Sequence, residues 1–119
     1  MVPYDMLKNV LEYIERNLAE DCDIAAIART FSISQVHLRR IFKIAFGVSL
    51  SGYIRSRRLS SSLELLLNKN MTVLDVANEC GYSYEQSYIR AFKKEFGILP
   101  GSYIKSCQGV AVTPPIEIQ

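Results

Sequence analysis

Residues 23 to 58 read DIAAIARTFSISQVHLRRIFKIAFGVSLSGYIRSRR and combine positive charge with a helical spacing of apolar residues. No acidic residue lies between Asp23 and Glu64, whereas seven basic residues do: Arg29, Arg39, Arg40, Lys43, Arg55, Arg57 and Arg58. Within SQVHLRRIFKIAF, helical periodicity gathers Leu38, Ile41, Phe42 and Ala45 on one side and Val36, Arg39, Arg40 and Lys43 on the other. We therefore expect a helix with a buried back and a basic front.

Polar capping residues and a turn surround this helix. Asp23 is a good N-cap for a short helix from Ile24 to Thr30, and Ser34 is one for the basic helix. Residues 31–33 form the turn, with Ser32 where glycine is usual in a helix-turn-helix. If Ser32 adopts a positive φ, the strain is about 1 kcal/mol. A basic helix behind a short helix and a tight turn fits the DNA major groove.

The length and charge of the chain bound its architecture. The 119 residues, 49% of them hydrophobic, are enough for one domain or for two small subdomains that share an element. The net charge of +2 hides an uneven distribution: residues 1–23 carry −4, residues 24–63 carry +7 and the remainder carries −1. We expect a strongly sided molecule.

The flanking sequence predicts further helices. An amphipathic helix with an acidic outer face is expected over residues 5–20, and a long one over residues 50–69. At 1.5 Å per residue the long helix spans about 30 Å, close to the roughly 34 Å of one DNA turn. Its expected buried positions are Leu50, Tyr53, Ile54, Leu63, Leu66 and Leu67.

Two capping-box patterns mark later helices. Thr72 with Asp75 predicts a helix from Val73 to Cys80, and Ser83 with Gln86 predicts one that ends near Phe96. Residues 100–106 are expected to form a last short helix, followed by an extended segment, GVAVTPPIEIQ.

The second half of the chain repeats the first. Ile24, Ile27 and Ala28 recur at an offset of 49 as Val73, Val76 and Ala77. From the basic helix onward the offset is 50, and the recurring residues are Arg40, Phe42, Lys43, Phe46 and Gly47 as Arg90, Phe92, Lys93, Phe96 and Gly97. Two similar helical subdomains follow from this repeat.

Several functional classes are disfavoured by the composition. Three widely spaced cysteines and one histidine predict reduced thiols in a cytoplasmic protein and no metal site. There is no membrane-length apolar run and no signal peptide. We find no phosphate-binding loop, paired carboxylates or activated nucleophile, so we expect neither an enzyme nor a cofactor.

Five motifs resemble the DNA-binding domain of the AraC/XylS family, and most of all its small MarA, SoxS and Rob-like transcription regulators. They are HLRRIFK (37–43), SGYIRSRRL (51–59), VANECGY (76–82), RAFKKEFG (90–97) and PGSYIK (100–105). The resemblance implies an all-α fold of two helix-turn-helix subdomains, residues 1–48 and 71–106, joined by a linker helix over residues 49–70. Residues 107–119 form a tail that can lead into a missing domain.

The resemblance also implies which residues meet DNA, with two reading helices in neighbouring major grooves over about 20 bp. The base-reading residues are Val36, Arg39 and Arg40 in the first helix and Gln86, Ser87 and Arg90 in the second. Gln35, Lys43, Arg55, Arg57 and Lys93 are assigned to phosphate.

Alternative roles remain open for several of these residues. Each arginine can contact phosphate alone, Arg55 and Arg57 can form a solvated linker face, and Gln86 can be spent on capping.

The leading hypothesis is a sequence-specific regulator that binds double-stranded DNA, an activator that recruits RNA polymerase by family resemblance. One chain can suffice, and the oligomeric state is open. The first alternative is a helical protein-interaction module that reads no bases. The second is the DNA-binding part of a larger, effector-gated regulator.

Overall fold

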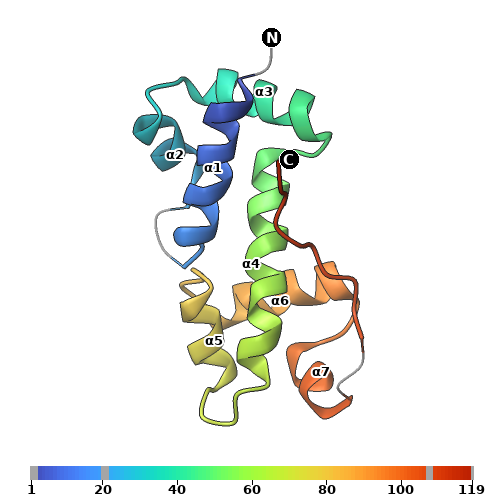
Figure 1. The fold of residues 1–119 in the computed structure, drawn as a ribbon. Helices are drawn as coiled ribbons and strands as arrows, with labels where there is room; N and C mark the ends of the chain where they lie inside the picture. The colour runs from blue at the N-terminus through green and yellow to red at the C-terminus, as the bar shows by residue number, and fades with distance from the viewer. Residues whose placement is uncertain (1–2, 20–21, 107–108, 119) are drawn as a thin grey trace. The chain divides into compact units, whose positions relative to one another are not determined.

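A computed structural model describes residues 3–19, 22–106 and 109–118. These residues contain no strand and form the helices α1 (Tyr4–Arg16), α2 (Ile24–Thr30), α3 (Gln35–Phe46), α4 (Leu50–Leu66), α5 (Val73–Glu79), α6 (Glu85–Phe96) and α7 (Pro100–Ser106) (Figure 1). The all-α prediction is confirmed. The chain divides into unit 1, residues 1–55 and 115–119, and unit 2, residues 56–114.

Unit 1 packs its helices around one apolar core. α1 contributes Leu7, Val10, Leu11 and Ile14, α2 contributes Ile24, Ile27 and Ala28, α3 contributes Leu38, Ile41 and Phe42, and α4 contributes Leu50, Tyr53 and Ile54. α1 therefore covers the helix-turn-helix formed by α2 and α3, as its apolar spacing predicts.

Unit 2 has a smaller core of the same kind. Its buried residues are Leu59, Leu63 and Leu66 of α4, Val76 and Ala77 of α5, Cys80, and Tyr88 and Phe92 of α6. α7 supports this core through the partly buried Tyr103, whose ring lies 6.2 Å from that of Phe92. The second helix-turn-helix, α5 and α6, thus shares one core with α4, and α7 packs against α6.

Residues 109–118, here called the C-terminal strap, run back beside α4 (Figure 1). In unit 2, the Thr113 N–H donates to Ser60 Oγ at 2.8 Å, and Arg57 donates from Nη1 to the Thr113 carbonyl at 2.6 Å. In unit 1, the Ile116 N–H donates to the Tyr53 hydroxyl at 3.0 Å, and Ile118 packs against the core. The predicted extended segment is therefore hydrogen-bonded and packed.

The first helix was expected over residues 5–20, but α1 ends at Arg16. Three further predictions about the helices need correction. α4 ends at Leu66 instead of residue 69, because the chain turns there with Leu67 and Asn68 donating to Glu64 and Leu65 carbonyls. Leu67, predicted to be buried, is consequently 49% exposed.

The third of these corrections concerns the N-cap of α6. This residue is Tyr84, without a side-chain cap, so the capping box predicted at Ser83 and Gln86 does not form. The capping boundary lies one residue further along than the sequence pattern indicated.

Candidate nucleic-acid interface

The basic face of α3 is built by burying the opposite face. Leu38 and Phe42 are fully buried, which fixes the rotation of the helix about its own axis. The exposed side chains of α3 are Gln35, Val36, His37, Arg39, Arg40, Lys43 and Ile44. The exposed set includes every residue that we assigned to DNA on this helix.

Both ends of α3 are capped by polar groups. Ser34 Oγ accepts from the His37 N–H at 3.1 Å. At the other end Gly47 adopts φ 75°, and Lys43 Nζ donates to its carbonyl at 3.1 Å. A lysine ammonium has three donors, so this contact leaves Lys43 free to bind a phosphate as well.

The turn between α2 and α3 is tight because backbone bonds close it. The Ile33 N–H donates to the Ala28 carbonyl at 3.0 Å, and Ser32 has φ 52°. Ser32 thus adopts the positive φ that the sequence analysis considered for this position. In unit 2 the Tyr82 N–H donates to the Ala77 carbonyl at 2.9 Å, and Gly81 takes up the positive φ at 86°.

α6 repeats the arrangement with a less basic surface. Tyr88 and Phe92 are fully buried, and the exposed residues are Gln86, Ser87, Arg90, Lys93 and Lys94. Lys93 Nζ donates to the Gly97 carbonyl at 3.1 Å, as Lys43 does to that of Gly47. Since no capping box forms, the Gln86 side chain is not spent on capping.

A buried hydroxyl pair fixes α6 against α4. Tyr88 donates to Ser62 Oγ at 2.7 Å, and Ser62 donates to the Leu59 carbonyl at 2.6 Å. Burial raises the pKa of the Tyr88 phenol, so this residue stays protonated and keeps its donor. The bond therefore orients the helix that carries Arg90.

The two linker residues assigned to phosphate differ in their placement. Arg55 is exposed, whereas Arg57 is only 8% exposed and donates to the carbonyl of Thr113 in the strap. The prediction that Arg57 contacts phosphate is corrected, because its guanidinium is buried and occupied. Sequence spacing along α4 gave no signal of a partner 56 residues away.

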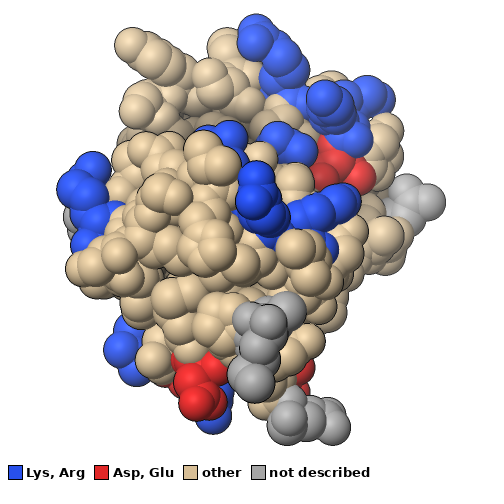
Figure 2. All heavy atoms as spheres, turned by 90° about the horizontal axis from the view of Figure 1, so that it is seen from above, with Lys and Arg blue, Asp and Glu red and all other residues tan. Residues whose placement is uncertain are grey.

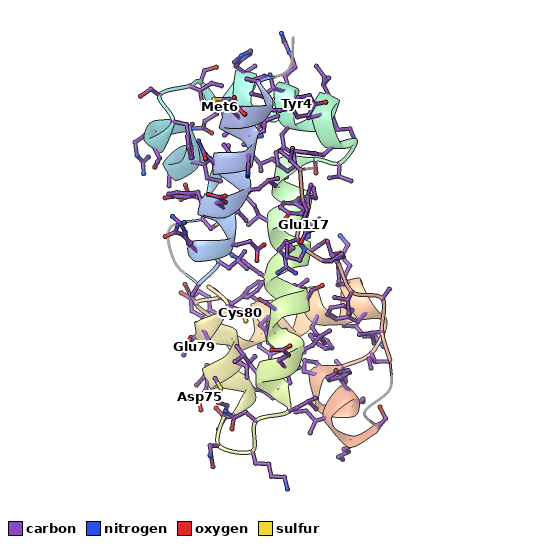
Figure 3. The ribbon with its side chains drawn as sticks, viewed as in Figure 1. Tyr4, Met6, Asp75, Glu79, Cys80 and Glu117 are labelled. Atoms are coloured by element: carbon purple, nitrogen blue, oxygen red, sulfur yellow. The ribbon has the colours of Figure 1, made fainter. Side chains whose placement is uncertain are left out.

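Basic side chains gather on part of the face drawn in Figure 2, with few acidic side chains among them. Acidic residues occur elsewhere: Figure 3 shows Asp75 and Glu79 on the outer side of α5. Cys80 directly follows α5 and is buried. Burial, with a smaller effect of Glu79, raises the pKa of the Cys80 thiol to about 11. This thiol is protonated at neutral pH, which is unfavourable for redox chemistry.

Cysteines and acidic side chains are the other groups that could form a site. Cys22 and Cys80 are both buried free thiols, and Cys107 lies outside the described residues. Within residues 3–19, 22–106 and 109–118, no group of three or more His, Cys, Asp or Glu side chains is arranged to hold a metal ion. None of the described helices combines the length and apolar character of a membrane span.

Comparison with known proteins adds sequence relatives. Residues 27–106 match the family described as "Helix-turn-helix domain". The "Probable transcription factor PqrA" of Proteus vulgaris is 37% identical over 99 residues, 83% of this chain and 80% of that protein. The "Transcriptional regulator Rob" of Salmonella typhimurium is 31% identical over 115 residues, 95% of this chain. The chain spans only 40% of the length of Rob.

A solved structure has the same fold. The C-terminal domain of AraT, a response regulator from Geobacillus stearothermophilus, superposes with a TM-score of 0.81 at 25% identity. The match covers 85% of this chain and 84% of that domain, so it includes both helix-turn-helix motifs.

Proposed function

The chain belongs to the AraC-type helix-turn-helix family, and from this premise we propose that it is a transcription regulator that binds double-stranded DNA through α3 and α6. The proposed base-reading residues are Val36, Arg39 and Arg40 on α3 and Gln86, Ser87 and Arg90 on α6. Gln35, Lys43, Arg55 and Lys93 are the proposed phosphate contacts. No catalytic role is proposed.

The exposed face of α3 carries this proposal. Arg39 and Arg40 are exposed on a helix whose opposite side is buried. An exposed arginine can donate two hydrogen bonds to O6 and N7 of guanine, which discriminates bases by about 1–3 kcal/mol. Val36 is 69% exposed and offers an apolar contact to a thymine methyl group.

Selection from a random duplex library, followed by sequencing, tests the proposal. We expect two short preferred blocks about 10 bp apart, one helical turn, because each reading helix occupies one major groove. If no sequence is enriched and all duplexes bind alike at moderate salt, base reading is refuted and the protein-interaction module is favoured instead.

The two helices should contribute unequally. Replacing Arg39 and Arg40 with alanine should weaken binding to the selected duplex much more than Arg90→Ala, because α3 loses two of its bidentate donors. Lys8→Ala is a matched control, since Lys8 is an exposed cation on α1. In titrations at several salt concentrations, each lost phosphate contact should lower the salt slope by about 1. Equal losses for the α3 and α6 variants would contradict the proposed asymmetry.

The biological role is inferred from the relatives. PqrA is described as a probable transcription factor and Rob as a transcriptional regulator. We propose that this chain activates transcription in the cytoplasm through contact with RNA polymerase. Because the chain spans 40% of Rob, the larger, effector-gated regulator remains the second candidate. An in vitro transcription assay with the selected site upstream of a promoter distinguishes activation from repression.

A further inference from the structure

Tyr84 is the N-cap residue of α6 and does not behave as a cap. Its side chain makes no capping hydrogen bond. It is 74% exposed, a high value for a large aromatic residue. Its hydroxyl forms no hydrogen bond with the described residues. The side chain therefore serves neither the helix nor the core of unit 2.

The equivalent position in unit 1 shows what a capping residue does there. Ser34 precedes α3 as Tyr84 precedes α6, and Ser34 Oγ accepts from the His37 N–H. A side-chain cap of this kind is worth about 1 kcal/mol. Unit 2 lacks this stabilisation, although a serine, Ser83, lies only one residue away.

Tyr84 lies at the N-terminal end of the reading helix α6, where contact with DNA is expected. Residues at the N-terminal end of a recognition helix lie nearest to DNA in a helix-turn-helix complex. Gln86 and Ser87, the proposed base-reading residues, follow Tyr84 directly and are also exposed. α6 is the less basic of the two reading helices. A hydrogen bond from a neutral hydroxyl at its N-terminal end would therefore add to the few contacts that its basic side chains can make.

We propose that Tyr84 is a DNA-contact residue, with its hydroxyl donating to a backbone phosphate and its ring packed on the adjoining sugar. This inference rests on the proposed function. Tyrosine hydroxyls are among the side-chain donors that bind phosphate oxygens, which receive about half to two-thirds of protein–DNA hydrogen bonds. The contact fixes the register of α6 and reads no base itself.

Two substitutions separate this role from a structural one. Tyr84→Phe removes only the hydroxyl and should weaken binding to the selected duplex about tenfold, as loss of a hydrogen bond to a charged group does. The salt slope should not change, because no cation is lost. Tyr84→Ser also removes the ring and should bind more weakly still. It introduces a good N-cap, so its Tm should rise by about 4 °C.

Higher stability with weaker binding is a combination that a structural residue would not give. Tyr4→Phe is the control, since Tyr4 is a half-exposed tyrosine on α1, and it should bind like the unaltered protein. If both Tyr84 variants bind within about twofold of the unaltered protein, the Tyr84 contact is refuted while DNA binding stands. If the unaltered protein binds no selected duplex, the proposed function fails and this inference fails with it.

Discussion

Units 1 and 2 contain the same helix-turn-helix motif but have different residues at three equivalent positions. The turn residue is Ser32 in one and Gly81 in the other, both with positive φ. The helix N-cap is Ser34 in one and Tyr84 in the other. The buried position one turn into the reading helix is Leu38 in unit 1 and Tyr88 in unit 2. Unit 1 has the strained turn with a good cap, and unit 2 has the relaxed turn without one.

The aromatic core shows what is held constant between the units. The ring centroids of Phe42 and Phe46 lie 4.8 Å apart, and those of Phe92 and Phe96 lie 4.7 Å apart. The packing that orients each reading helix is thus kept, while turn and cap residues vary. Local costs of about 1 kcal/mol at a turn or cap are small beside the burial of a ring, so they can differ without changing the fold.

Removing the central ring should have the largest effect and should be the same in both units. We expect Phe42→Ala and Phe92→Ala each to lower the free energy of unfolding by about 3–5 kcal/mol, because both rings are fully buried. Denaturant titration measures this, with the 65% exposed Ile44 replaced by alanine as a control. A loss at only one of the two positions would refute the equivalence of the cores.

The hydroxyl pair of unit 2 should have an intermediate effect. Ser62→Ala leaves the buried Tyr88 hydroxyl without its acceptor and should cost about 1–3 kcal/mol. Tyr88→Phe should cost less, since Ser62 keeps its bond to the Leu59 carbonyl. A double-mutant cycle should show coupling between the two substitutions; strict additivity would mean that the bond contributes nothing.

Alkaline pH should distinguish unit 2 through its buried thiol. The folded state keeps the Cys80 proton up to a pKa of about 11, whereas a thiol with its ordinary pKa of 9.0 loses the proton earlier. The stability due to this group is therefore complete below pH 9 and is lost as the pH rises through about 11. The Tm of Cys80→Ala should fall less steeply than that of the unaltered protein as the pH rises over this range. An unchanged slope would refute the assignment to Cys80.

Exchanging the turn residues should give the smallest effects, of opposite sign. Ser32→Gly should stabilise unit 1 by up to about 1 kcal/mol, because glycine adopts positive φ without strain. Gly81→Ser should destabilise unit 2 by about the same amount. The Tm of each variant, compared with that of the unaltered protein, measures these effects. If both substitutions shift the Tm in the same direction, another contact of the Ser32 side chain matters more than its φ.

The sequence predicted those parts of the fold that local patterns encode. Helical periodicity, with Asp23, Ser34 and Thr72 as caps, predicted the helices and their buried faces, because caps and apolar spacing act within one or two turns. The N-cap of α6 was missed because one additional residue in the turn moves Ser83 out of position. A capping box requires that register as well as its two residue types.

Contacts distant in sequence could not be predicted in this way. The sequence places Arg57 in a stretch of basic residues, but its guanidinium donates to the carbonyl of Thr113 in the strap. The exposure of Arg39, Arg40 and Arg90 follows from helical periodicity, whereas the unusual character of Tyr84 emerged only when the first residue of α6 was known.

The strap also has a consequence for the order of folding during synthesis. Ile116 and Ile118 are partly buried and pack against the core of unit 1, and they leave the ribosome after all of unit 2. Domains usually fold from the N-terminus as they emerge, but here the half that is translated first receives these packing residues only after unit 2 has been translated. A nascent chain stalled before residue 115 should therefore hold an incomplete unit 1 beside a unit 2 whose residues have all been made.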